Sequence, residues 1–157
     1  MTWRGSTDFK DRIFASLPYL IPLFYAIPFG RFLFSQFPVL KLILIPLIPL
    51  EIIYSVPFAG IAVFFILFLA VVRNPRVAHF IRFNTMQAIL LDIIIILCGL
   101  LLPILLEGLG TNLLTETLYN IVFLGTLFAC GYSIVQSCLG LYAEIPGISE
   151  AVYQQVR

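Results

Sequence analysis

The polar side chains that could carry chemistry are concentrated in one stretch of the chain, RNPRVAHFIRFNTMQAILLD, residues 73 to 92. Asn84, Gln87 and Asp92 fall there at the start of a long apolar run and form a candidate polar helix face. A carboxylate inside a membrane costs about 2.5–3.5 kcal/mol and is a candidate for ion or proton transfer by default. Asp92 lies only about two turns into its run. A structural acid bonded to a neighbouring hydroxyl or to Arg82 is therefore the competing interpretation.

Three arginines in the same stretch, Arg73, Arg76 and Arg82, suit a different chemistry. Guanidinium groups beside a bilayer bind anionic headgroups and fix the side of the membrane on which a loop stays. The single histidine has no cysteine or second histidine near it, and the three cysteines lack ligand spacing. The chain also lacks HExxH, GxSxG and phosphate-loop motifs. We therefore predict no cofactor, no metal site and no enzyme activity.

The elements that position these residues are predicted to be membrane-spanning helices. Hydrophobic residues make up 61% of the 157 residues and charged residues 11%, with a mean hydropathy of +1.07. Soluble domains hold roughly 45–50% apolar residues, whereas a helix that crosses a bilayer needs about 20 in a row. We predict an all-α integral membrane protein with four spans, at residues 13–33, 52–72, 84–106 and 117–141. They form one membrane domain, 13–143, between a short N-terminal segment, 1–12, and a C-terminal tail, 144–157.

Proline makes the first third of the chain irregular. Seven of the ten prolines lie between Pro18 and Pro57. An interior proline removes a backbone hydrogen bond and kinks or breaks a helix. Residues 37–50, between the first two spans, hold two prolines near their end. We predict that this segment is interfacial or re-entrant, with a fifth span as the alternative.

Lysine and arginine placement predicts the orientation of the spans. The basic residues gather in two segments that four spans would place on one side, Arg4, Lys10, Arg12 and Arg73, Arg76, Arg82. The connection Glu107–Glu116 has acids and no bases and falls on the other side. Arg31 and Lys41 are the discordant pair. We therefore predict that both termini are cytoplasmic, or stromal in a plastid.

The last predicted span carries small residues at every fourth position, Gly125, Ala129, Ser133 and Ser137. Ridges of this kind let membrane helices approach closely, and their hydroxyls bond across the contact. We predict helix packing along this ridge, either within the chain or between copies in a homo-oligomer.

One family shares these motifs. The stretch VVRNPRVAHFIRFNTMQAILLDI, with SLPYLIPL, GRFLFSQFP, IYSVPFAGIAVFF and LYNIVFLG, resembles the twenty-kilodalton subunit of the translocon at the inner envelope of chloroplasts. The resemblance runs from about residue 15 to residue 140. It implies four membrane spans, a place in importing precursor proteins, and a role in forming or supporting the conducting path. The N-terminus is too short and too acidic for a transit peptide, so we expect a cyanobacterial or plastid-encoded member.

The resemblance also implies the partners: the lipid bilayer, other translocon subunits and translocating precursor proteins, but no nucleic acid. Our hypothesis is that Asn84, Gln87 and Asp92 contact either the passing chain or partner subunits. Two rival functions stay open. One is a small transporter or ion channel that uses Asp92 as its titrating group, and the other is a non-conducting membrane scaffold.

Overall fold

The structure, a computed structural model, describes residues 7–156, and every regular element in that range is helical. Arg4 of the predicted N-terminal segment lies outside the described residues. Three helices are long and apolar enough to cross a membrane, Phe9–Gln36, His79–Leu105 and Leu113–Cys138. A bent pair, Pro38–Tyr54 with Ala59–Val72, makes a fourth if it is counted as one span. The predicted all-α fold with membrane-crossing helices is confirmed at this level.

The first long helix is assembled from short pieces because its prolines interrupt the α-helical bonding. It runs through α1 (Phe9–Ser16), η1 (Leu17–Tyr19), α2 (Leu20–Ala26), η2 (Ile27–Gly30) and α3 (Arg31–Gln36). Proline opens both tighter 3-10 segments, η1 and η2. Since proline lacks an N–H, it is tolerated at the start of each piece, and the chain stays helical without a sharp break. Asp8 caps the start by accepting from the Phe9 N–H at 2.8 Å.

The second crossing is broken in the middle. Its first arm comprises η3 (Pro38–Leu47) and α4 (Ile48–Tyr54), and its second comprises α5 (Ala59–Phe65) and the π-helix η4 (Ile66–Val72). The two arms meet at 101°. The break falls where Pro57 follows a turn and Phe58 takes a left-handed φ of 63°. Residues 37–50, predicted to be interfacial or re-entrant, thus belong to the first arm of this pair; their depth in the bilayer stays a prediction.

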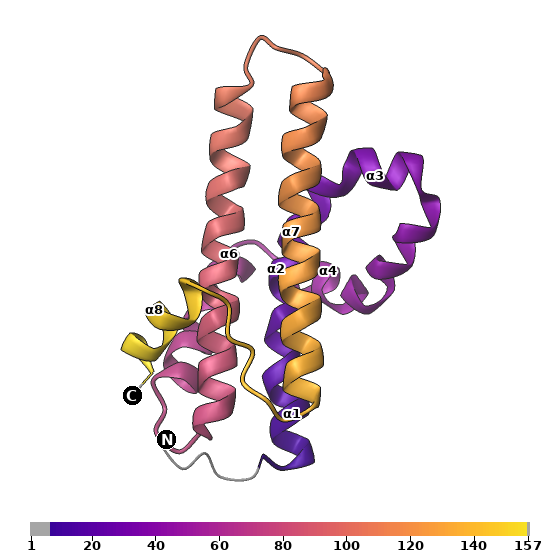
Figure 1. Cartoon of the computed structure of the whole chain (residues 1–157). Helices are drawn as coiled ribbons and strands as arrows, with labels where there is room; N and C mark the ends of the chain where they lie inside the picture. The colour runs from indigo at the N-terminus through magenta and orange to yellow at the C-terminus, as the bar shows by residue number, and fades with distance from the viewer. Residues whose placement is uncertain (1–6, 157) are drawn as a thin grey trace.

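The longest uninterrupted α-helices, α6 (His79–Leu105) and α7 (Leu113–Cys138), lie side by side and are joined at the end of the molecule opposite α1 (Figure 1). Asn112 caps α7 by accepting from the Thr115 N–H at 3.0 Å. The structure starts the third predicted span at His79, five residues before the predicted start at Asn84. A helix boundary of this kind depends on the turn that precedes it, and the apolar pattern does not mark that turn.

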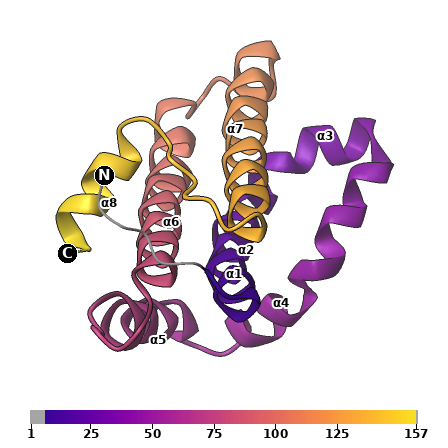
Figure 2. The same ribbon diagram turned by 60° about the horizontal axis from the view of Figure 1, so that its bottom comes forward.

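The predicted C-terminal tail contains a further helix, α8 (Ile148–Gln155), which packs on α6 on the side away from α1 (Figure 2). Gly147 begins it at a φ of +80°, a conformation that favours glycine. Val152 and Val156 are buried against Val72, Phe83 and Ile89. The tail therefore contributes to the core of the described structure.

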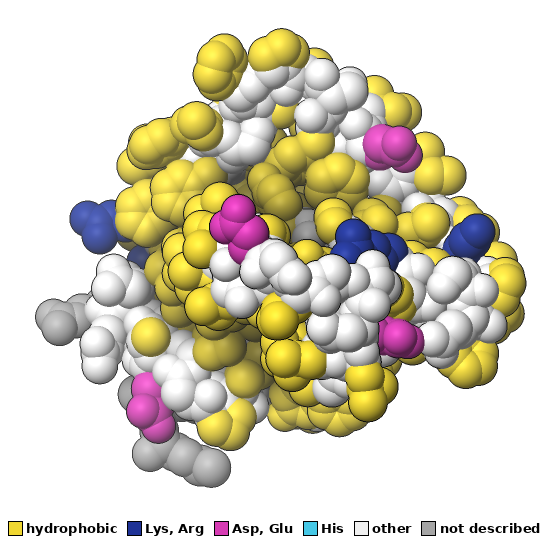
Figure 3. Space-filling model, turned by 90° about the horizontal axis from the view of Figure 1, so that it is seen from above, with side chains coloured by type: hydrophobic (Ala, Val, Ile, Leu, Met, Phe, Trp, Pro, Cys, Tyr) yellow, Lys and Arg dark blue, Asp and Glu magenta, His cyan; other side chains and the backbone are white. Residues whose placement is uncertain are grey.

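Apolar side chains cover much of the outside of the molecule, as the view onto the α6–α7 connection shows (Figure 3). Leu100, Ile104, Leu113 and Phe128 are all more than half exposed. Polar side chains instead take a large share of the buried interior, including Asn84, Gln87 and Ser133. An apolar outside, with polar side chains buried among the apolar core, is the arrangement expected of a protein whose solvent is lipid.

Candidate functional site

Asn84 and Gln87 lie on the first turns of α6, and neither side chain has any exposed surface. They are surrounded by the first long helix, by α7 and by the C-terminal segment. A buried carboxamide has to find hydrogen-bond partners, because the surrounding side chains and lipid supply none. The contacts of these two amides therefore define the centre of the bundle.

The Asn84 amide connects three helices. Its Oδ1 accepts from the Tyr19 hydroxyl at 2.8 Å and from the Ser137 hydroxyl at 3.1 Å. Its Nδ2 donates to the Phe80 carbonyl at 2.8 Å, one turn earlier in α6. Tyr19 comes from the first long helix and Ser137 from the end of α7. One side chain thus fixes α6 against both neighbours.

Gln87 continues the network toward the C-terminal segment. Its Nε2 donates to the Tyr19 hydroxyl at 2.9 Å and to the Ala143 carbonyl at 2.7 Å. Its Oε1 accepts from the Ser149 hydroxyl at 2.8 Å, and that hydroxyl in turn accepts from the Ile145 N–H at 2.6 Å. The amide nitrogen donates two hydrogen bonds and the amide oxygen accepts one, so both polar atoms of the Gln87 side chain have partners.

The two amides and the side chains that bond them, Tyr19, Ser137 and Ser149, form a network with little exposed surface; we call this set the amide network. It consists of Tyr19, Asn84, Gln87, Ser137 and Ser149. A buried polar network whose members are all satisfied specifies one arrangement of its helices. Each bond between membrane helices contributes about 0.6 kcal/mol on average, so their effect is chiefly to select that arrangement.

Asp92 lies apart from the amide network, although it follows Gln87 by little more than one turn. It borders a small cavity of about 50 Å³ together with Tyr25, Tyr54 and Gly60. Its Oδ1 atom is buried and has no hydrogen-bond partner among the described residues. Tyr54 and Gly60 flank the break in the bent pair, so the acid faces that break. The structure therefore divides the three predicted residues of the polar face between two sites.

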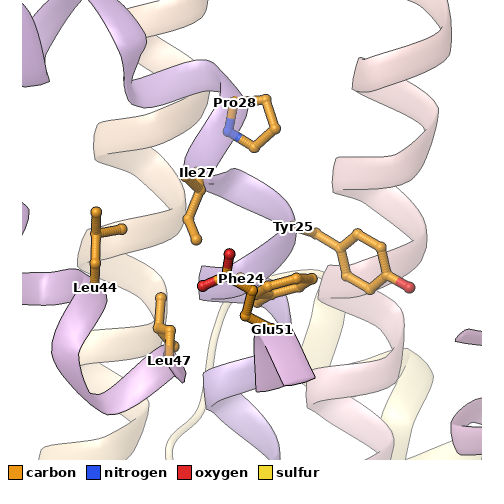
Figure 4. Close-up of a pocket in the computed structure, with 7 residues that line it drawn as sticks. All are labelled: Phe24, Tyr25, Ile27, Pro28, Leu44, Leu47 and Glu51. Carbon is orange, nitrogen blue, oxygen red and sulfur yellow. The ribbon is translucent and has the colours of Figure 1, made fainter. Parts of the chain in front are cut away.

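A second cavity, of about 390 Å³, lies between the first long helix and the first arm of the bent pair and is lined by apolar side chains with Glu51 (Figure 4). Tyr25 borders both cavities, and its ring points away from Leu44 and Leu47 (Figure 4). A β-carbon added at Gly60 would lie 2.9 Å from the Tyr25 hydroxyl. Glycine at this position therefore leaves room for the tyrosine.

The three predicted arginines also lie at more than one place in the structure. Arg73 and Arg82 border a polar hollow of about 350 Å³ with Gln154 and Gln155 of α8. The Arg82 Nε donates to the Val72 carbonyl at 2.8 Å and so helps to end η4. Arg76 is exposed in the turn before α6. The structure brings two of these side chains together and leaves Arg76 outside the hollow.

The small-residue ridge of α7 is buried at one end and exposed at the other. Ser133 and Ser137, near the C-terminal end, have no exposed surface, and Ala129 is half-buried. Gly125 is exposed, and nothing in the described structure lies within 4 Å of a β-carbon added there. Two of the four residues thus pack within the chain, while the N-terminal part of the ridge faces outward.

Sequence reasoning missed Tyr19 and Ser149 of the amide network, and also Ala143, whose carbonyl accepts from Gln87. Tyr19 sits in SLPYLIPL, a motif that carries the resemblance, and its hydroxyl is a polar atom inside an apolar run. That hydroxyl was an available signal. Ser149 gave none, because it belongs to a polar tail in which a serine is ordinary. No three His, Cys, Asp or Glu side chains in residues 7–156 are grouped so as to hold a metal ion.

Comparison with known proteins gives a consistent result. The family described as "Chloroplast import apparatus Tic20-like" matches residues 6–152. A Tic20 family protein from Synechocystis sp. is 53% identical over 160 residues, which cover 100% of this chain and 99% of that protein. "Protein TIC 20-II, chloroplastic" from Arabidopsis thaliana is 35% identical over 99% of this chain and 78% of its own length. The Tic20 family protein Ycf60 from Porphyra purpurea is 32% identical over 99% of this chain and 80% of its own length.

Proposed function

The chain belongs to the Tic20-like family of the chloroplast import apparatus, and on that premise we propose that it is a membrane subunit of a protein-translocating machinery. The observation that carries the proposal is the extent of the match, which spans residues 6–152 and so includes every crossing, the amide network and most of α8. The chain would support the path that a precursor protein follows through the membrane.

The geometry supports a division of labour between the two polar sites. The amide network has its partners within the chain, so it would hold the first long helix, α6, α7 and α8 in one arrangement. Asp92 has an unbonded oxygen and faces a cavity at the break of the bent pair. The bent pair would be the element that moves, and Asp92 the polar group that meets the passing chain or a partner subunit.

Site-specific photo-cross-linking in native membranes tests this proposal. A photoreactive residue is placed at Asp92, with a matched control at Phe128, which is 80% exposed on α7. A precursor is stalled in transit by a folded domain at its trailing end. We expect a precursor adduct from position 92 and none from position 128. Adducts with other subunits alone from both positions would contradict a path and support the scaffold.

A second experiment asks whether the two polar sites are needed at all. Asp92→Leu and Gln87→Leu are each expected to impair complex assembly or import, because one removes the group at the break and the other opens the amide network. If both variants assemble and import normally, the polar residues serve packing alone.

A second candidate function rests on the position of Asp92. A buried acid beside a broken helix is the arrangement in which many transporters bind a coupling ion. Purified protein in liposomes distinguishes this function from protein translocation. A solute or ion flux that depends on pH and is lost in Asp92→Asn would favour a transporter. Absence of any flux in the unchanged protein would contradict a transporter and favour the import subunit.

A further inference from the structure

An apolar groove of about 700 Å³ opens between the first long helix, the two arms of the bent pair and the start of α6. Leu17, Leu50, Val71, Val77 and Ile81 line it with other apolar side chains. The groove is separate from the cavity at Asp92 and from the cavity at Glu51, although Ile21 and Leu67 border both the groove and the Asp92 cavity. Neither the amide network nor the proposed path gives it a role.

One polar side chain lines the groove, and it lacks a partner. Thr85 has no exposed surface, and its Oγ1 atom makes no hydrogen bond to any described residue. A threonine hydroxyl in a helix usually bonds the carbonyl one turn back when nothing else is available. Leaving such a donor unpaired inside a membrane protein is unfavourable. Because this hydroxyl has no accessible surface, the groove presents an apolar lining and suits an apolar chain.

Positive charge lies at one end of the groove. Val71 and Val77 both line it, and the turn that joins them carries Arg73 and Arg76, both exposed. Ile81 also lines it and is followed directly by Arg82. Arg73 additionally borders the polar hollow with Gln154 and Gln155. An occupant whose tail fills the groove would place its other end beside these cations.

We propose that the groove binds one anionic phospholipid. Its acyl chain lies along Leu17, Leu50 and Ile81, and its phosphate lies at the Arg73–Arg76 turn. A polypeptide fits less well, because a spanning helix about 30 Å long and about 10 Å wide needs several times the groove's volume. The proposal stands independently of protein import, since it uses neither Asp92 nor the amide network.

Native mass spectrometry of the purified protein tests headgroup selection. The probes are phosphatidylglycerol and phosphatidylcholine with identical acyl chains. We expect one phosphatidylglycerol to be retained in preference to phosphatidylcholine.

Arg73→Gln and Arg76→Gln should each lower that preference about fivefold, the equivalent of about 1 kcal/mol per basic residue. Lys41→Gln, the matched control, removes an exposed cation away from the groove and should change nothing. Equal retention of the two lipids by the unchanged protein would overturn the proposal.

Two further variants test the groove itself. Ile81→Trp should fill it and abolish retention of both lipids, whereas Thr85→Val keeps the shape and, because that hydroxyl has no accessible surface, should leave retention unchanged. Because Ile81→Trp could also disturb folding, a photoreactive residue at position 81 is activated in native membranes and the adduct is weighed. A lipid adduct supports the proposal, and an adduct with a polypeptide overturns it.

Discussion

At the scale of single residues, Asn84 and Gln87 of α6 determine how three long helices and the C-terminal segment meet. Each amide bonds side chains or carbonyls that lie 53 to 68 positions away in the sequence. Apolar packing in a membrane is poorly directional, because lipid tails and leucines are equally apolar. Directional bonds at the centre supply the specificity that packing lacks.

Gln87→Leu should therefore destabilise the protein out of proportion to its size. The change leaves the Ala143 carbonyl without its donor and the Ser149 hydroxyl without its acceptor, and each orphaned group costs about 1–3 kcal/mol. Thermal unfolding in detergent measures the loss. Gln136→Leu is the control, since that glutamine lies on α7 outside the amide network. Equal melting temperatures for the two variants would show that the network is not needed for stability.

Sequence reasoning placed Asn84 and Gln87 on one helix and identified them as unusual, but it grouped them with Asp92. Spacing in the sequence predicts which residues lie on the same helix. It does not predict which other elements surround each turn of that helix. The first turns of α6 are enclosed on several sides, whereas Asp92 borders a cavity that the first long helix and the bent pair line. The partners Tyr19 and Ser149 come from elements distant in sequence, so one helix's periodicity could not reveal them.

At the scale of elements, the first long helix and α7 approach closely at Gly30. A β-carbon there would lie 2.7 Å from a ring atom of Phe34 and 2.8 Å from one of Phe123. The φ of Gly30 is −81°, which any residue adopts, so space alone requires glycine at this position. Aromatic rings of both helices close over this contact.

Gly30→Ala should lower the free energy of unfolding by about 1–3 kcal/mol, the usual cost of overpacking. Gly125→Ala should instead raise it by roughly 0.5–1 kcal/mol, because alanine is the better helix former and nothing lies near that position. Denaturation of both variants in the same detergent measures the pair. Effects of the same sign would contradict the close approach at Gly30.

The break in the bent pair depends on Phe58, which holds a left-handed conformation with its side chain 82% exposed. Such a conformation costs a non-glycine residue roughly 1–2 kcal/mol. Phe58→Gly should therefore stabilise the fold by up to about 1 kcal/mol, after allowing for the greater freedom of glycine in the unfolded chain. Phe65→Gly within α5 is the control and should destabilise. A loss of stability in both would mean that the break is not strained.

The proline pattern predicted irregular helices in the first third of the chain, and the structure shows two outcomes. Pro18 and Pro28 open 3-10 pieces of a helix that continues, whereas the region of Pro57 turns the chain by 101°. The difference depends on the neighbours. The pieces of the first helix are held against α6 and α7, while the residues of the break are largely exposed. A sequence motif does not carry that information.

At the scale of the whole molecule, we expect the turn that carries Arg73 and Arg76, before α6, to lie on one side of the membrane. The connection between α6 and α7 should lie on the other side. Single cysteines at Ala78 and Gly110, in a protein without its native cysteines, are labelled in sealed vesicles with a membrane-impermeant thiol reagent. One position should react from outside, and the other only after the membrane is opened. Reaction of both cysteines from the same side would show that α6 does not cross the membrane and would therefore contradict four crossings.

The amide network also sets an order of events during synthesis. The Ala143 carbonyl and the Ser149 hydroxyl are partners of Gln87, and both residues follow the end of α7 in the sequence. The preceding crossings are made first, yet Gln87 cannot obtain these two partners until residues 143–149 have been synthesised. The membrane domain therefore reaches its final arrangement only after all of its crossings have been made. Nascent chains that stall before residue 143 should be exposed to quality-control proteases with their helices inserted but not yet locked together.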